Sequence, residues 1–260
     1  MKKIKLLSIV VTSYIALVTA ASASAPPLFT PAQEARIGEI AADYLVSHPE
    51  ILVQVSQKLQ TQQRERQQQA FAIKVMDNQN ALLTDPDTPV IGPEDAPVAV
   101  IEFFDYQCVH CSHMAPVIEE VMKQQSSVRY LFKEWPIFGD RFENSRKAAE
   151  RGVAIWKAAG PDAYLTYHNG IYDTGNIEGA LTLDDISQAT RAALGKKPFP
   201  EGDQMAALAR NDELARTLGL TGTPGLIVMP VRQATPKNIT VFPGTATVEQ
   251  LKAAIDKARQ

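Results

Sequence analysis

The spacing of apolar positions first indicates a helical segment that has no core of its own. Ile37, Ile40 and Tyr44 recur at helical spacing. The stretch 60–69 is wholly polar and contains six glutamines, so a helix there is solvated or bridges packed regions. Too few apolar residues lie between positions 24 and 87 for independent folding. We therefore expect residues 24–87 to be helical and to pack on the same chain or on a second copy of it.

A different pattern begins at residue 98. A nearly continuous apolar run predicts a buried strand over 98–104. A helix over about 108–125 follows, with an apolar inner face, and a second strand is predicted at 128–135. This order forms a βαβ unit, which implies parallel strands joined by a right-handed crossover.

The rest of the chain is first helical and then returns to strands. Residues 141–218 contain four helical stretches, strands are predicted at 225–229 and 239–242, and a last helix covers about 248–257. The whole order is βαβ, then helices, then ββα. It describes an α/β, thioredoxin-like fold with a helical domain inserted at about 141–218. This predicted domain covers residues 88–260.

The first residues indicate export. Three lysines precede a short apolar run over 6–18, and the small residues at 21–25 have the pattern of a signal-peptidase site. We expect a cleaved signal peptide over residues 1–23. An uncleaved anchor helix is the alternative, but the apolar run is too short to span a bilayer comfortably.

Charge and composition exclude several partners. The formal net charge is −3, and loss of residues 1–23 removes three lysines and no acidic residue, which leaves −6. This acidic balance argues against a nucleic-acid or anionic-membrane partner, because both call for basic patches. The apolar fraction of 45% is ordinary for a globular chain.

Cys108 and Cys111 are the two cysteines of the chain. A bridge between them closes too small a loop to restrain the unfolded chain, so a stapling role is a poor fit. At a helix N-terminus, free backbone N–H groups and the helix dipole favour a thiolate. We therefore predict Cys108 as nucleophile and Cys111 as resolving thiol of a redox-active disulfide. His110, when cationic, would stabilise the thiolate, and Val109 contributes shape and apolarity.

Other interpretations of the cysteine pair are weaker. The pair could be half of a zinc site, but the chain has no second cysteine pair. A Cu(I) site could combine Cys108 and Cys111 with His113 or Met114, because soft thiolates select Cu(I). An inert structural disulfide is disfavoured by the loop size. We expect redox chemistry that uses no metal and no cofactor.

Two motifs together resemble a known family. Residues 101–111, Ile-Glu-Phe-Phe-Asp-Tyr-Gln-Cys-Val-His-Cys, and the stretch Gly222-Thr223-Pro224-Gly225 resemble the DsbA-like thiol–disulfide interchange proteins of the thioredoxin superfamily. The resemblance implies that Pro224 follows a cis bond, packs across from the cysteines and takes part in catalysis. Thr223 is similar to the threonine of disulfide isomerases rather than the valine of dedicated oxidases. Val109, Thr223 and Pro224 are the expected client-binding residues.

Glu102 is an acidic residue within the predicted buried strand. An unpaired buried carboxylate is costly, so Glu102 should be protonated or partnered. The resemblance implies a catalytic acid that assists proton transfer to and from Cys111. We expect Lys133, in the neighbouring strand, to be its partner. The alternative is a register that leaves Glu102 at a wet edge of the sheet.

Residues 24–87 resemble the oligomerisation regions of DsbA-like proteins of the Com1 and suppressor-of-copper-sensitivity types. The resemblance implies a homo-oligomer, with a dimer favoured, that acts in the periplasm as a disulfide isomerase and can also oxidise dithiols. Its partners would be unfolded or misoxidised exported proteins and a membrane redox partner. A monomeric dithiol oxidase and a Cu(I)-binding or scaffold protein are the alternatives.

Overall fold

The computed structural model describes residues 28–199 and 202–260, so the predicted signal peptide at 1–23 lies outside the described residues. The chain divides into two compact units, residues 1–58 and 59–260. Within the described parts of both units, every helix is too short or too polar to cross a membrane.

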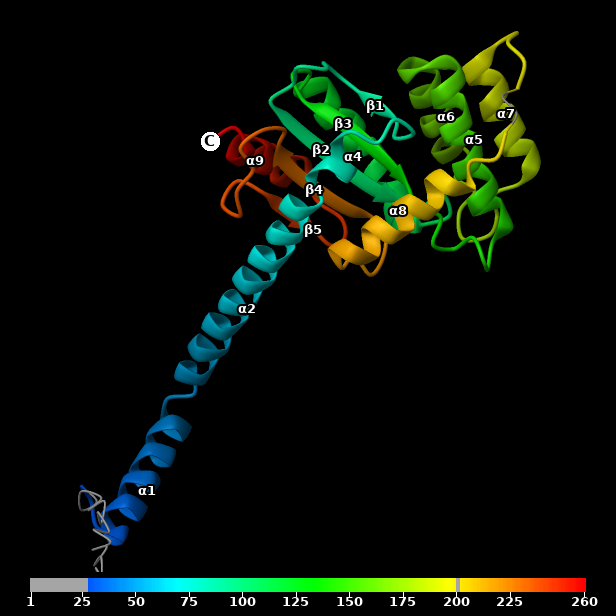
Figure 1. The fold of residues 1–260 in the computed structure, drawn as a ribbon. Coiled ribbons are helices and arrows are strands. Elements are labelled where there is room, and N and C mark those ends of the chain that lie inside the picture. The colour runs from blue at the N-terminus through cyan, green and yellow to red at the C-terminus, as the bar shows by residue number, and fades with distance from the viewer. Residues whose placement is uncertain (1–27, 200–201) are drawn as a thin grey trace, which may run out of the picture. The chain divides into compact units, whose positions relative to one another are not determined.

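The first unit contains α1 (Pro31–Ser47) and the beginning of α2 (Glu50–Asp77) (Figure 1). The side chains and backbone of Thr30 and Gln33 form a capping box that starts α1, with a proline at its first position. α1 ends shortly before Pro49, because a proline disfavours helical backbone at the preceding residue. None of the residues of α1 is buried, so its apolar stripe is exposed.

The second unit is built on a five-stranded sheet with the order β1-β3-β2-β4-β5 (Figure 1). In chain order the strands are Val90–Ile91, Val98–Phe104, Arg129–Glu134, Gly225–Pro230 and Thr240–Phe242. β2 and β3 are parallel, which confirms the predicted βαβ unit, and the other pairs are antiparallel. β1 was not predicted, because its two residues are too few to show a period among turn-forming neighbours.

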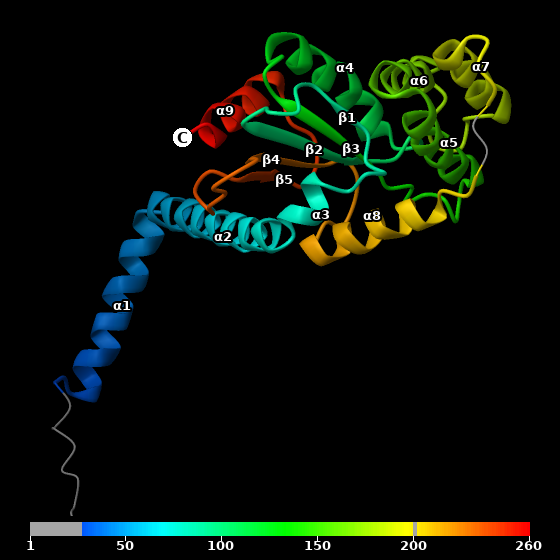
Figure 2. The same cartoon turned by 45° about the horizontal axis from the view of Figure 1, so that its top comes forward.

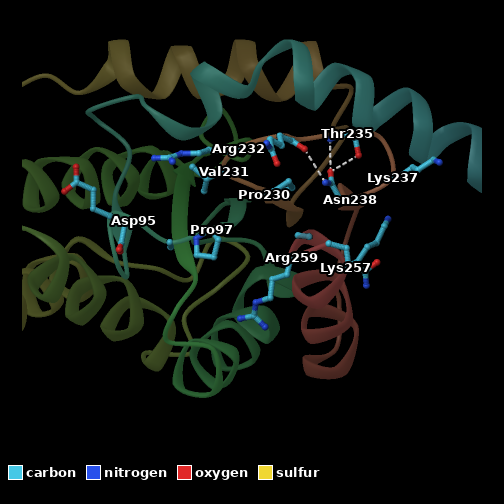
Figure 3. A pocket seen from close by; sticks show the side chains of 15 residues that line it. Asp95, Pro97, Pro230, Val231, Arg232, Thr235, Lys237, Asn238, Lys257 and Arg259 are labelled. Carbon is cyan, nitrogen blue, oxygen red and sulfur yellow. Dashed lines mark hydrogen bonds between the residues drawn. The ribbon is translucent and has the colours of Figure 1, made fainter.

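Helices cover both faces of this sheet (Figure 2). α4 and α9 pack on one face, and α3, α8 and the second half of α2 pack on the other. α5, α6 and α7 pack on one another as the core of the inserted helical region, and four helices are confirmed between residues 141 and 218. Their bounds are α3 Gln79–Leu83, α4 Val109–Gln124, α5 Glu143–Ala159, α6 Pro161–Asp173, α7 Leu183–Leu194, α8 Met205–Leu218 and α9 Val248–Ala258.

The central strand β2 supplies both hydrophobic cores. Val100 and Phe104 belong to the core under α4 and α9, whereas Ile101 and Phe103 belong to the core under α8 and α2. Successive side chains of a strand point to opposite faces, so a strand covered on both sides is apolar throughout. All seven residues of β2 are accordingly buried.

The second half of α2 packs on the sheet of its own unit. Ala72 and Val75 are buried in the same core as Ile101. The polar stretch 60–69 is largely exposed, as a solvated helix should be, but its residue Gln68 is an exception. The Gln68 amide donates to the carbonyl of Val241 at 2.6 Å and accepts from the N–H of Val241 at 3.2 Å. Because Val241 lies on the edge strand β5, this side chain covers part of the sheet edge.

Candidate active site

The two cysteines lie at the start of α4, as predicted. Cys108 is the N-cap residue, with an extended backbone, and Cys111 lies in the first turn. The N–H of Cys108 donates to the carbonyl of Asp105, and the N–H of Ser112 donates to the carbonyl of Cys108, both at 3.0 Å. The side chains of Cys108 and Cys111 are 4% and 1% exposed, and both are free thiols.

A proline turn faces the first cysteine. The peptide bond between Thr223 and Pro224 is cis, as the resemblance implied. The Sγ of Cys108 lies 3.3 Å from the carbonyl oxygen of Thr223, to which it donates a hydrogen bond when it is protonated. The turn leads directly into β4, the neighbour of β2 in the sheet, which holds it across from the start of α4.

The two sulfurs have opposite electrostatic surroundings. A hydrogen bond from the Cys111 side chain, helped by the Thr223 side chain and the N–H groups of Cys111 and His110, lowers the pKa of Cys108 from 9.0 to about 5, although burial opposes this. Burial, together with the hydrogen bond and charge of Cys108, raises the pKa of Cys111 well above its ordinary value. At neutral pH Cys108 is therefore a thiolate and Cys111 keeps its proton.

Glu102 lies in the centre of the sheet and is 3% exposed. The alternative of a wet sheet edge is therefore wrong. Burial, and then the charge of Cys108, raises the pKa of Glu102 from 4.5 to about 8. Its Oε2 has no hydrogen-bond partner among residues 28–199 and 202–260. Glu102 is thus a buried, neutral acid that is electrostatically coupled to the thiolate.

The expected pairing of Glu102 with Lys133 is wrong. Glu102 is opposite Phe132 in the β2–β3 register, and Lys133 is one residue further, so its side chain points to the other face of the sheet. There the Nζ of Lys133 donates to Thr88 Oγ1 at 2.6 Å and to the carbonyl of Ala81 at 3.0 Å. A sequence places two residues in neighbouring strands but does not fix the register that decides which face they share.

A hollow of about 340 Å³ opens beside the proline turn. It is lined by His110, Thr223 and Pro224, together with residues of the turn that follows β5. The structure therefore brings three of the predicted site residues together. Val109 is half-buried and does not line this hollow.

The methionine sulfur considered as a Cu(I) ligand is buried and already hydrogen-bonded. Met114 is 1% exposed, and its Sδ accepts a hydrogen bond of 3.4 Å from the N–H of Ala246. His113, the other considered ligand, is exposed on α4. In the part of the chain that the structure describes, no three His, Cys, Asp or Glu side chains are grouped as metal ligands.

A buried network at the turn before Cys108 was not predicted from the sequence. The hydroxyls of Tyr106 and Tyr164 both donate to Glu134 Oε1 at 3.0 Å. Glu134 is completely buried, and burial raises its pKa well above the ordinary value. Gly152 of α5 makes room for this carboxyl, because a Cβ there would lie 2.4 Å from Glu134 Oε1.

Asp105 anchors the same turn. Its carboxylate accepts from the N–H of Gln107 at 2.7 Å, from the N–H of Phe138 at 2.9 Å and from Ser145 Oγ at 2.8 Å. For both carboxyl groups, the signal in the sequence was an acidic residue at the end of a predicted buried strand. Asp105 follows β2, and Glu134 lies at the end of β3. Only the fold shows that the two strand ends lie side by side.

Fold and site together define a thiol–disulfide oxidoreductase, with a thiolate at a helix start and a second thiol one turn away. Family models agree with this class. One described as Thioredoxin matches residues 84–257, and one described as Copper resistance protein ScsC N-terminal domain matches residues 33–66. The chain belongs to the thioredoxin family.

Individual relatives extend this similarity. Disulfide bond formation protein D of Bacillus subtilis is 33% identical over 186 residues, which cover 65% of this chain and 76% of that protein. BcfH of Salmonella enterica Typhimurium has a TM-score of 0.71 and 37% identity, over 88% of this chain and 97% of that one. A linker-deletion variant of Proteus mirabilis ScsC has a TM-score of 0.62 and 26% identity, over 90% and 99%. The chain spans 24% of the length of another relative, Na(+)/H(+) antiporter NhaA 3 of Salinispora tropica, with 30% identity over 160 residues.

Proposed function

We propose that the protein is a homo-oligomeric disulfide isomerase of the periplasm, with a dimer favoured, that can also oxidise dithiols. Its clients are exported proteins with wrong disulfides, and a membrane redox partner resets the cysteine pair. The residues that we assign to catalysis are Cys108, Cys111, His110, Glu102 and Pro224.

In the proposed reaction, the Cys108 thiolate attacks one sulfur of a client disulfide. A bond forms between Cys108 and that sulfur, and the other client sulfur leaves as a thiolate. This thiolate can attack another client disulfide, which forms a new client bond and releases a different client thiolate. That second thiolate then attacks the client sulfur bonded to Cys108 and displaces Cys108 as a thiolate, which completes an isomerisation. Alternatively Cys111 gives up its proton, attacks the Cys108 sulfur and releases a reduced client. Glu102, once ionised, is the group assigned to accept the Cys111 proton.

The observation that carries the assembly proposal is the exposed apolar stripe of the first unit. Ile40, Tyr44 and Leu52 are each 54% exposed in the single chain. Large apolar groups gathered in this way mark an interaction site in a soluble protein. A second copy of the chain is the occupant that we propose, supported by the match of residues 33–66 to the ScsC N-terminal domain. Joined active sites raise the effective concentration of one thiolate around a client held by the other.

The test is the rescue of scrambled ribonuclease by the reduced protein, combined with light scattering. Wild type should restore ribonuclease activity, and Cys108→Ser should not. Ile40→Lys combined with Leu52→Lys should give a monomer that still reduces a small disulfide but rescues ribonuclease several-fold more slowly. Leu183→Lys, at an equally exposed position of 54% on α7, is the matched control and should stay assembled. A monomeric wild type, or an assembled protein that rescues nothing, would contradict the proposal.

A further inference from the structure

Gln107, immediately before Cys108, makes contacts that the disulfide chemistry does not require. Its side chain is buried, with 1% exposed. Its Oε1 accepts a hydrogen bond from the N–H of Gly179, and its Nε2 donates to the carbonyl of Asn176 at 3.4 Å. Its backbone carbonyl accepts from the N–H of Glu178 at 3.0 Å. Gln107 therefore binds one short segment through both its side chain and its backbone.

That segment, residues 175–179, lies in the connection between α6 and α7 and needs external support. Glu178 has a φ of 54°, a left-handed conformation that is disfavoured for a residue with a side chain. Gly179 has a φ of 99°, and a Cβ there would lie 2.7 Å from the ring of Phe142. Such a backbone persists only where its surroundings hold it, and here the hydrogen bonds to Gln107 do so.

The segment 175–179 binds the residue before the nucleophile, and the strand order indicates that it lies on the other side of β2 from the proline turn. The proline turn leads into β4, and the inserted helices follow β3. β2, which ends shortly before Cys108, lies between these two strands in the sheet. Glu178 and Gly179 are exposed, so the segment has a solvent-facing surface beside the residue that precedes Cys108.

We propose that Gln107 is a positioning residue that holds residues 175–179 as a second wall of the client site, facing the proline turn across Cys108. This wall contacts the client side chain next to the cysteine under attack. Because Glu178 places a carboxylate on it, the wall favours a client with a basic residue at that position. The inference rests on the proposed action on protein clients, but not on isomerase direction or assembly.

The first test uses Gln107→Met, which keeps the length of the side chain and removes its hydrogen bonds. The reduced full-length protein is mixed with a peptide whose single cysteine is disulfide-bonded to glutathione, and separately with oxidised glutathione. The wall is then no longer held in place, so the rate constant with the peptide, divided by that with oxidised glutathione, should fall about tenfold through weaker peptide binding. Gln79→Met is the matched control, because Gln79 also makes a half-buried side-chain bond, 2.8 Å to the carbonyl of Val231. It should leave the ratio unaltered.

A second variant keeps the proposal testable if Gln107→Met does not fold. Glu178→Lys leaves the demand for left-handed backbone as it is and reverses the charge of the wall. It should reverse the preference between two glutathione-linked peptides that carry Lys or Glu next to the cysteine, by about threefold for an exposed charge. Equal discrimination by wild type and Glu178→Lys would overturn the inference. If wild type reacts no faster with peptides than with glutathione, the proposed action on clients fails instead.

Discussion

Cys108 makes the stability of the reduced protein depend on pH in a definite direction. Its pKa is about 5 in the folded protein and 9.0 ordinarily, so the stabilisation is complete above pH 9.0 and is lost as the pH falls through 5. The disulfide form has no thiolate and does not gain this stabilisation. At neutral pH this contribution favours the reduced form, so we expect the disulfide form to be an oxidant.

Glu102 should produce the opposite dependence. Its pKa is about 8 in the folded protein and 4.5 ordinarily, so the folded state keeps a proton that the unfolded state loses. Stability should then fall as the pH rises from about 4.5 to about 8, with a slope of at most about 1.4 kcal/mol per pH unit. Glu102→Gln should remove this slope and be the more stable form at pH 8. Urea denaturation between pH 5 and 9 measures it.

That comparison is best made in a Cys108→Ser background, where the thiolate does not titrate. Burial, the largest cause of the Glu102 shift, remains in that background. Glu94→Gln removes an exposed acid and should leave the slope in place. Parallel curves for Glu102→Gln and its parent would show that Glu102 is ionised in the folded protein.

Single residues differ in how far sequence alone could place them. The positions of Cys108, Cys111 and Pro224 followed from two short motifs, because local sequence fixes a helix start and a proline turn. The partner of Lys133 did not, since it depends on the parity of strand register. The contacts of Gln107 also required the fold, because their partners lie about 70 residues away.

At the scale of elements, the contact between α5 and the end of β3 requires a residue without a side chain on α5. A Cβ at Gly152 would lie 2.4 Å from Glu134 Oε1 and 3.3 Å from the hydroxyl of Tyr106. Gly152→Ala should therefore destabilise the protein by about 1–3 kcal/mol, as overpacking does. In a Glu134→Ala background the same substitution should cost much less, because the carboxyl is gone. Urea denaturation of the four proteins gives the coupling energy.

Gly170→Ala in α6 is the control for that cycle. The nearest atom to a Cβ there is the Cβ of Ala189 at 3.6 Å, an ordinary contact. The substitution should be neutral or stabilise the helix by up to about 1 kcal/mol. A Gly152→Ala protein as stable as Gly170→Ala would mean that the Glu134 network is not packed as described.

Most elements could be predicted because their signals are periodic or continuous. The buried run of β2 and the amphipathic helices have this character. β1 has two residues and no such signal, and it exists because β3 offers it a partner. The role of the second half of α2 was left between two alternatives, since an apolar stripe does not identify the surface that it covers.

At the scale of the whole molecule, chains shortened from the N-terminus to different residues test whether the second half of α2 stabilises the second unit. A chain that starts at Leu59 keeps the second unit complete. A chain that starts at Thr88 loses the buried Val75 and Leu82. It also loses two groups next to the buried Lys133, which are the carbonyl of Ala81 and the carboxylate of Asp85. Each large apolar side chain contributes about 1.5–3 kcal/mol, and domains are stable by only about 5–15 kcal/mol.

We therefore expect residues 59–260 to melt close to the full chain and to react with a small disulfide at the same rate. Residues 88–260 should be insoluble or should melt many degrees lower. Thermal denaturation of the full chain and the two fragments decides between them. Equal melting temperatures for the two fragments would show that the second half of α2 adds nothing to the core.

The two hydrogen bonds between Gln68 and Val241 have a consequence for the proposed action on unfolded chains. An open strand edge invites addition of a foreign strand, which is the first step of aggregation. Here the glutamine amide fills both the donor and the acceptor of the middle residue of β5. A chain that offers extended backbone is thereby discouraged from extending the sheet at β5, so the outermost strand does not compete with the cysteine site for the clients that we propose.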